Sequence, residues 1–461
     1  MRSENTLEPN ARPKRSTFLS QASTLSGPIS LPILFGMCLT SLNVLANQTV
    51  SVISEVSGET LQKQVPLHEV SFWNSVLSAM FAGAFAFSLG LFSMGLLKKT
   101  PHAHFKGIFS VSSLLILLTN LICGFFTNIP LLFIARFFMG AGTGAACALG
   151  PVYYIALLGP KNGSKIATLQ GLFINLGILF ERRLSNSDFF SGNSRIFFFI
   201  SGASLLALLM NIFWTKNLAG ESPNNPGEIE IIRATESGVP AEKVSEDENA
   251  KFFIGVCLFM HIVQQLTGIN PILSNVFILF TENIKDQTGP AKAFFDVSGA
   301  LGTGISCFIM FFRVAWFKHM VLTSGLLACG SFLAMIQAGP VASCWGAAFY
   351  LFFFAVGLAS LPWMLPSMIL RGERNVAIAA GLGSLANSLF ASVYSFFYIE
   401  AYRRVGNAVF GVFALFCLIE AVAGFFLVRR SDRLQRNEVR AALCAEGVPL
   451  KDLQAPEEKM S

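Results

Sequence analysis

The chain alternates long apolar segments with short polar ones, and the length of the apolar segments indicates helices that cross a membrane. A spanning helix needs about 20 mostly apolar residues. Twelve segments fit this pattern, the fifth being the shortest, over approximately 29–53, 71–97, 107–126, 130–158, 165–181, 196–216, 251–280, 294–316, 319–338, 341–370, 377–400 and 407–428. The sequence therefore predicts an all-α membrane protein with twelve transmembrane helices.

A long polar segment between the sixth and seventh apolar segments divides the chain into two groups of six helices. The predicted organisation is an N-terminal tail over 1–27, a six-helix bundle over 28–216, a central loop over 217–250, a second six-helix bundle over 251–428 and a C-terminal tail over 429–461. GMCL in the first helix resembles GVCL in the seventh. Such internal repetition is common in transporters.

Composition supports a lipid environment. Hydrophobic residues make up 53% and charged residues 13% of the 461 residues, which is too apolar for a soluble globular protein of this length. The first 27 residues are polar and lack the apolar core of a secretory signal. These residues are therefore predicted to form a disordered tail.

The charged residues predict how the chain is oriented across the membrane rather than a site for a ligand. The net charge is +6, and the basic residues lie mainly between apolar segments, on the side that holds both termini. Because Lys and Arg accumulate on the cytoplasmic side, both termini are predicted to be cytoplasmic, and nucleic-acid binding is not predicted. The nine cysteines and five histidines form no ligand cluster, so we predict neither a metal site nor a cofactor.

Amides within the apolar segments are the candidate binding residues. A buried amide without a partner costs roughly 2 to 7 kcal/mol, so each needs a partner inside the bilayer. Amides offer donors and an acceptor that suit the hydroxyls of a neutral polyol, although they also join neighbouring helices. The candidates are Asn47, which also lies in a glycosylation sequon, and Gln170, Gln264, Gln265, Asn270 and Asn387.

Two further features accompany these amides. In IVQQLTGINPILSNV (262–276), Gly268 and Pro271 predict a helix break, which is tolerated at bilayer depth where it lines a cavity. Trp363, in a segment bent by Pro362 and Pro366, is predicted to present a flat apolar face to a sugar ring.

Several motifs resemble those of the sugar porter family within the major facilitator superfamily. QQLTGIN (264–270) is similar to the seventh-helix signature of that family, whose amides contact the sugar. ARFFMGAGTGAACALGPVYY (135–154) is similar to the fourth-helix pattern, with Arg136 and Pro151 in place, while ESP (221–223) and Pro362-Trp363 match two further motifs. The resemblance implies the major facilitator fold, a central site for a hexose such as glucose, alternating access and, by default, the plasma membrane.

The chain departs from this family at the charged residues of the inner gate. GLFSMGLLKK (90–99) keeps Gly90, Lys98 and Lys99 but has Met94 and Gly95 where the family has an acid and an arginine. In the family these charged groups form ion pairs that close the cytoplasmic side. The resemblance therefore implies structural or gating roles for Arg136, Pro151, Gly268, Pro271, Gly90, Lys98 and Lys99, without most of the ion pairs.

The leading hypothesis is transport of a small neutral sugar. Asn47 stands where proton-coupled members have an aspartate, and because an asparagine does not titrate we predict facilitated diffusion. Glu420 is a mid-helix acid in the twelfth segment, which we expect at the periphery, and Asp296 and Glu400 are expected to reach the membrane surface. A proton-coupled symporter and a non-transporting sugar sensor are the alternatives. No cluster of titratable side chains predicts an enzyme.

Overall fold

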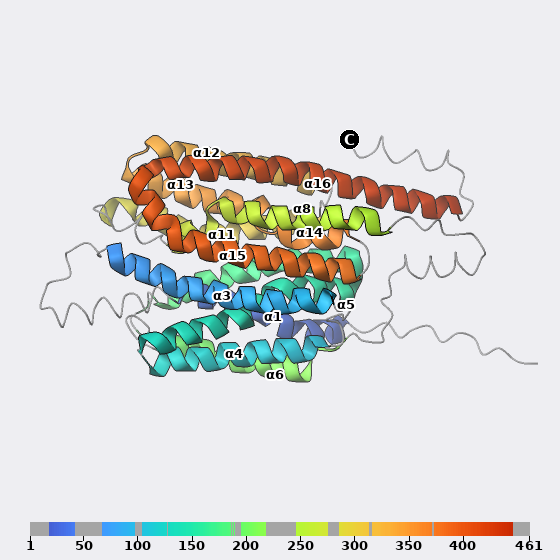
Figure 1. Cartoon of the computed structure of the whole chain (residues 1–461), viewed down its shortest axis with the longest axis horizontal. Helices are drawn as coiled ribbons and strands as arrows, with labels where there is room; N and C mark the ends of the chain where they lie inside the picture. Colours follow the sequence, from blue (N-terminus) through green and yellow to red (C-terminus); the bar gives the residue numbers. More distant parts are fainter. Residues whose placement is uncertain are drawn as a thin grey trace, which may run out of the picture.

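The structure, a computed structural model, describes residues 18–41, 67–96, 104–126, 128–185, 187, 189, 195–217, 246–274, 285–312, 316–370 and 373–445. Across these residues the chain is helical and contains no strand. The helices run roughly parallel to one long axis (Figure 1). Eleven segments among them are long and apolar enough to cross a bilayer, in agreement with the predicted class.

The first half of the chain builds one helical group. It consists of α1 (Phe18–Thr40), α3 (Leu67–Leu96), α4 (Phe105–Phe125), α5 (Ile129–Ser185) and α6 (Arg195–Phe213). Helix α1 packs against α5 and α6, and α4 packs against α5 and α6. Their buried faces form one continuous hydrophobic core.

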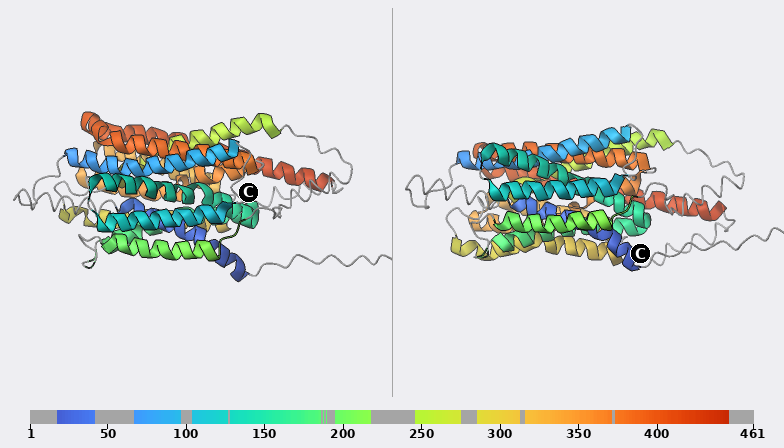
Figure 2. Two further views of the ribbon diagram at one scale, coloured as in Figure 1. Left: turned by 60° about the horizontal axis from the view of Figure 1, so that its bottom comes forward. Right: turned by 90° about the horizontal axis from the view of Figure 1, so that it is seen from below.

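The second half builds a second group. It consists of α8 (Glu246–Leu266), α9 (Ile269–Ser274), α11 (Lys285–Phe312), α12 (Phe317–Gln337), α13 (Pro340–Phe353), the π-helical turn η3 (Phe354–Leu358), α14 (Leu361–Ile369), α15 (Glu373–Val405), η4 (Gly406–Ala408) and α16 (Val409–Ala445). It has its own core. The two groups meet mainly where α3 packs on α15 and where α5 packs on α11, and Figure 2 shows the same helices from two further directions.

Helix α5 is continuous along the sequence, but in space it consists of two antiparallel arms. Gly163 lies against the backbone of Tyr154 and Ile155, although eight residues of a straight helix would separate them by about 12 Å. Further along, the side-chain amide of Gln170 donates to the carbonyl of Cys147 at 3.2 Å. The chain therefore folds back between these points, and the return arm coincides with the predicted fifth segment, 165–181.

The helix boundaries differ from the predicted ones in two places. Helix α1 begins at Phe18, so the prediction of a disordered tail is wrong for residues 18–27. Within and just after this polar stretch, the hydroxyls of Ser26 and Ser30 donate to the carbonyls of Ser23 and Gly27, so these polar groups have partners inside the helix itself. At the other end of the chain, α16 continues to Ala445 and projects beyond its neighbours (Figure 1).

The outer surface of the two groups is apolar. Large side chains such as Phe213, Phe308 and Phe426 are more than half exposed, an arrangement that is favourable only where lipid replaces water. Helix α1 begins and α16 ends at the same end of the bundle (Figure 1, right), which we call the terminal end. The other end is called the opposite end below.

Candidate functional site

A cavity of about 160 Å³ lies between the two halves. Helices α1, α3 and both arms of α5 line it from the first half, and α8, α9, α13, η3, α14 and α15 line it from the second. Six of the seven predicted binding residues contribute to its wall, namely Gln170, Gln264, Gln265, Asn270, Trp363 and Asn387. The seventh, Asn47, lies outside the described residues. None of the described lining residues carries a charge.

Gln264 of α8 is held by the break in the tenth predicted segment. Its amide nitrogen donates to the backbone carbonyls of Leu358 and Ala359 at 3.1 and 3.0 Å. Pro362 has no N–H, so the Leu358 carbonyl four residues earlier receives no helical hydrogen bond, and the Gln264 side chain takes the place of that donor. Asn387 of α15 then donates to the Gln264 carbonyl oxygen at 3.2 Å.

The second predicted amide pair lies at the break between α8 and α9. Asn270 donates to the side-chain oxygen of Gln265 at 2.5 Å. The backbone reverses handedness at Gly268, where φ is +83° and a β-carbon would meet the ring of Phe413. The break predicted from Gly268 and Pro271 is therefore present, with Pro271 inside the short α9.

The first half contributes amides from the return arm of α5. Gln170 is buried, and its carbonyl oxygen has no hydrogen-bond partner among the described residues. Asn175 also lines the cavity and donates to the carbonyl of Gly171 at 2.9 Å. Its oxygen lies against Gly299 of α11, so the absence of a side chain on Gly299 lets the two halves approach closely here.

Trp363 forms part of the apolar wall. The ring of His261 lies edge-on to it, with 4.7 Å between the ring centroids. His261 is buried, and its Nδ1 atom has no partner among the described residues. Sequence reasoning did not select this histidine, because a single histidine in an apolar segment forms no recognisable motif.

Sequence reasoning also missed smaller polar residues of the cavity wall. Thr143, Ser360, Ser384 and Ser388 all line it. Serine and threonine are common in apolar helices, where they bond to their own backbone, so their types alone do not distinguish a lining position from an ordinary one.

The residues assigned to gating are dispersed. Arg136 is fully buried and donates to the carbonyl of Cys38 at 2.8 Å. Pro151 lines a small gap near the terminal end, together with Pro366 of α14. Gly90 is exposed and has no close neighbour, whereas Lys98 and Lys99 lie outside the described residues.

Three acids lie within the helical groups. Asp296, expected at the membrane surface, forms a largely buried ion pair with Arg182, with 3.1 Å between Nη1 and Oδ1. Glu420 is not peripheral, because it is fully buried in the second half, and neither of its oxygens has a partner among the described residues. Glu181, which the sequence did not single out, is 1% exposed and accepts a hydrogen bond from Ser185 at 2.6 Å.

Several solved transporters have the same arrangement. The proton:xylose symporter XylE, bound to 6-bromo-6-deoxy-D-glucose, matches with a TM-score of 0.65 and 16% identity over 87% of this chain and 95% of that chain. This chain has the major facilitator fold. XylE from E. coli in a partially occluded inward-open conformation matches with a TM-score of 0.59 and 17% identity, over 87% of this chain and 96% of that one.

The fold also extends to a transporter of another substrate class. The human organic anion transporter MFSD10 matches with a TM-score of 0.61 and 13% identity over 88% of this chain and 99% of that chain. No protein-family model matches the sequence, and no curated protein matches it significantly. The likeness is therefore one of fold, and substrate must be argued from the cavity.

Proposed function

We propose that this multi-pass membrane protein transports a small neutral sugar, with a hexose such as glucose as the first candidate, by alternating access. The observation that carries the proposal is the central cavity, whose described wall holds amides from both halves and no charged side chain. Amides match the alternating donors and acceptors of neighbouring hydroxyls. An organic anion, the substrate class named for MFSD10, would leave its charge without a basic partner in this wall.

The hydrogen bonds that these amides form within the protein can be exchanged for hydrogen bonds to a bound sugar. Gln264 and Asn387 form hydrogen bonds to the protein, so they are satisfied when the cavity holds no sugar. The Gln170 oxygen has no described partner and lies buried against Gly150, so a reorientation of this side chain would let it accept a hydroxyl. A sugar can then be held by groups from both halves, which alternating access requires.

Uptake of labelled glucose into liposomes containing the purified protein tests this proposal. We expect Gln264→Ala and Asn270→Ala to reduce uptake by roughly 5- to 100-fold, because each removes hydrogen bonds worth about 1 to 3 kcal/mol when a partner is left unsatisfied. Gln337→Ala is the matched control, since this glutamine is exposed at the end of α12.

The control variant should transport as the parent does. If the parent moves no sugar from a panel of neutral hexoses and pentoses, the substrate proposal is wrong. If Gln264→Ala and Asn270→Ala transport as well as the Gln337→Ala control, the assignment of these amides to the sugar is wrong.

A further inference from the structure

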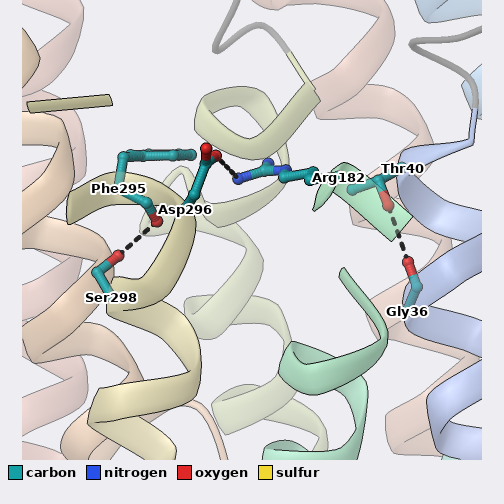
Figure 3. Close-up of polar contacts among 6 residues, drawn as sticks. All are labelled: Gly36, Thr40, Arg182, Phe295, Asp296 and Ser298. Carbon is teal, nitrogen blue, oxygen red and sulfur yellow. Dashed lines mark hydrogen bonds and ion pairs between the residues drawn. The ribbon is translucent and has the colours of Figure 1, made fainter. Parts of the chain in front are cut away.

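The two halves are joined near the opposite end by a buried ion pair. Arg182, at the end of α5 in the first half, donates to Asp296, near the start of α11 in the second. The side chains are only 8% and 14% exposed, and Figure 3 shows them pointing toward one another between the helices. Among ion pairs formed between described residues, this one alone connects the two halves.

The surroundings of the pair make it costly to separate. The Arg182 guanidinium lies over the ring of Phe295, 5.2 Å from its centroid, so one face is closed to water. Glu181 is buried beside it and interacts electrostatically with both Arg182 and Arg136. The cluster of Arg136, Glu181, Arg182 and Asp296 contains two positive and two negative side chains, so the removal of one charge leaves another uncompensated.

The other polar contacts between the halves are either exposed or neutral. At the far end of α11, Lys165 donates to the carbonyl of Phe311 at 3.2 Å, but this contact is exposed. Toward the opposite end, Ser78 and Ser392 exchange neutral hydrogen bonds with each other's carbonyls at 3.1 and 3.3 Å. Toward the terminal end, Ser88 and Ser384 share a hydrogen bond of 2.7 Å. Neutral hydrogen bonds of this kind contribute less than charge-assisted ones.

We propose that the Arg182–Asp296 pair is a latch that holds the opposite end of the transporter closed. The inference rests on the proposed function, because alternating access requires the halves to part at each end in turn. Parting here separates Arg182 from Asp296, and both must then be hydrated. The latch thus lies at the end opposite to the one where the sugar porter resemblance implies an ion-pair gate.

Single and double substitutions of the pair separate this role from general structural damage. Asp296→Asn leaves Arg182 buried without its partner, which favours a conformation in which the end opens and the guanidinium reaches water. Arg182→Ala likewise leaves Asp296 without its partner. The double variant Arg182→Leu/Asp296→Leu contains no unpaired charge, and apolar replacement of a buried pair is often well tolerated, so the end should close again.

The thiol of Cys147 provides a reporter, because this residue lines the cavity. A membrane-impermeant maleimide is added separately to right-side-out and inside-out vesicles, and Cys147→Ser identifies the signal. From the side that faces the opposite end, both single variants should be labelled several-fold faster than the parent, and the double variant should return close to the parent rate. Arg182→Lys, which keeps the charge but loses the planar fork, should be intermediate.

Glu400→Gln is the matched control, since Glu400 pairs with Arg404 near the same end but is half exposed. It should be labelled at the parent rate. The latch is excluded if the folded single variants are labelled no faster than this control. Where the single variants do not fold, Arg182→Lys takes their place in this comparison. The latch is also excluded if the double variant is labelled fastest of all. Labelling needs no substrate, so a wrong sugar assignment would leave this result unchanged.

Discussion

At the scale of single residues, Gln264 and Pro362 form one functional unit. Pro362 leaves the Leu358 carbonyl without a helical donor, and Gln264 supplies the donor from another helix. The amide is therefore shared between the helix break and any sugar in the cavity. A sugar that binds Gln264 must compete with the backbone of the tenth predicted segment.

Pro362→Ala tests this competition. The new N–H should donate to the Leu358 carbonyl and free one of the two hydrogen bonds of the Gln264 amide, the other being to Ala359, so we expect sugar affinity to rise several-fold while the turnover number falls because the helix break is stiffened. Binding is measured by calorimetry on purified protein and turnover by liposome uptake. Pro366→Ala is the matched control, because the carbonyl four residues before Pro366 is that of Pro362, to which no described side chain donates.

Equal affinities of the Pro362→Ala and Pro366→Ala variants would show that the Leu358 carbonyl does not restrain Gln264. A loss of affinity in Pro362→Ala alone would instead indicate that the bend is needed to place Trp363. The two explanations therefore predict opposite changes in the dissociation constant.

At the scale of helices, two breaks bring the binding residues together. Gly268 interrupts the seventh predicted segment with a left-handed residue, and η3 interrupts the tenth with a π-helical turn, a feature frequent at functional sites. Both breaks lie at the cavity. Regular helices through these points would carry the same side chains in different directions.

Gly268→Ala should destabilise the protein strongly. The left-handed backbone disfavours a β-carbon by about 1 to 2 kcal/mol, and the added carbon would also meet the Phe413 ring. Gly406→Ala is the matched control, because its φ is +58° but no atom lies within 4 Å of the added carbon. Thermal unfolding in detergent should show a clearly larger decrease in melting temperature for Gly268→Ala, and equal decreases would contradict the crowding at Phe413.

At the scale of the whole molecule, the open point is whether a proton drives transport. XylE is named as a proton symporter, but here the described cavity wall contains no carboxylate. Glu420 lies in the core of the second half, and Glu181 lies among the arginines of the latch. Neither acid lines the cavity, so we keep the prediction of facilitated diffusion.

An imposed pH gradient tests this prediction. In liposomes, labelled sugar should equilibrate at the outside concentration with or without the gradient, and Glu181→Gln and Glu420→Gln should not change the final level. Accumulation above the outside concentration that is lost in one of these variants would identify that acid as the proton carrier. Unchanged accumulation in both variants would place the carrier elsewhere in the chain.

The sequence by itself determined that the protein lies in a lipid bilayer, and it determined the class of fold and most of the candidate amides. Bilayer thickness fixes the length of an apolar segment, so apolar segments of that length predicted the helices without knowledge of their packing. The QQLTGIN signature likewise placed Gln264, Gln265 and Asn270 at a helix break, because Gly268 and Pro271 disfavour a regular helix wherever they occur.

Only the tertiary structure decided which polar groups meet. The partner of Gln264 is a carbonyl 94 residues away, and the partner of Asp296 is an arginine 114 residues away, so no local pattern could connect them. The sequence placed Asp296 near a helix end and named no partner for it, and packing of α5 on α11 set it against Arg182. Hydrogen bonds and ion pairs between helices depend on how the helices are arranged, and that arrangement follows from the shapes of whole buried faces rather than from any single segment.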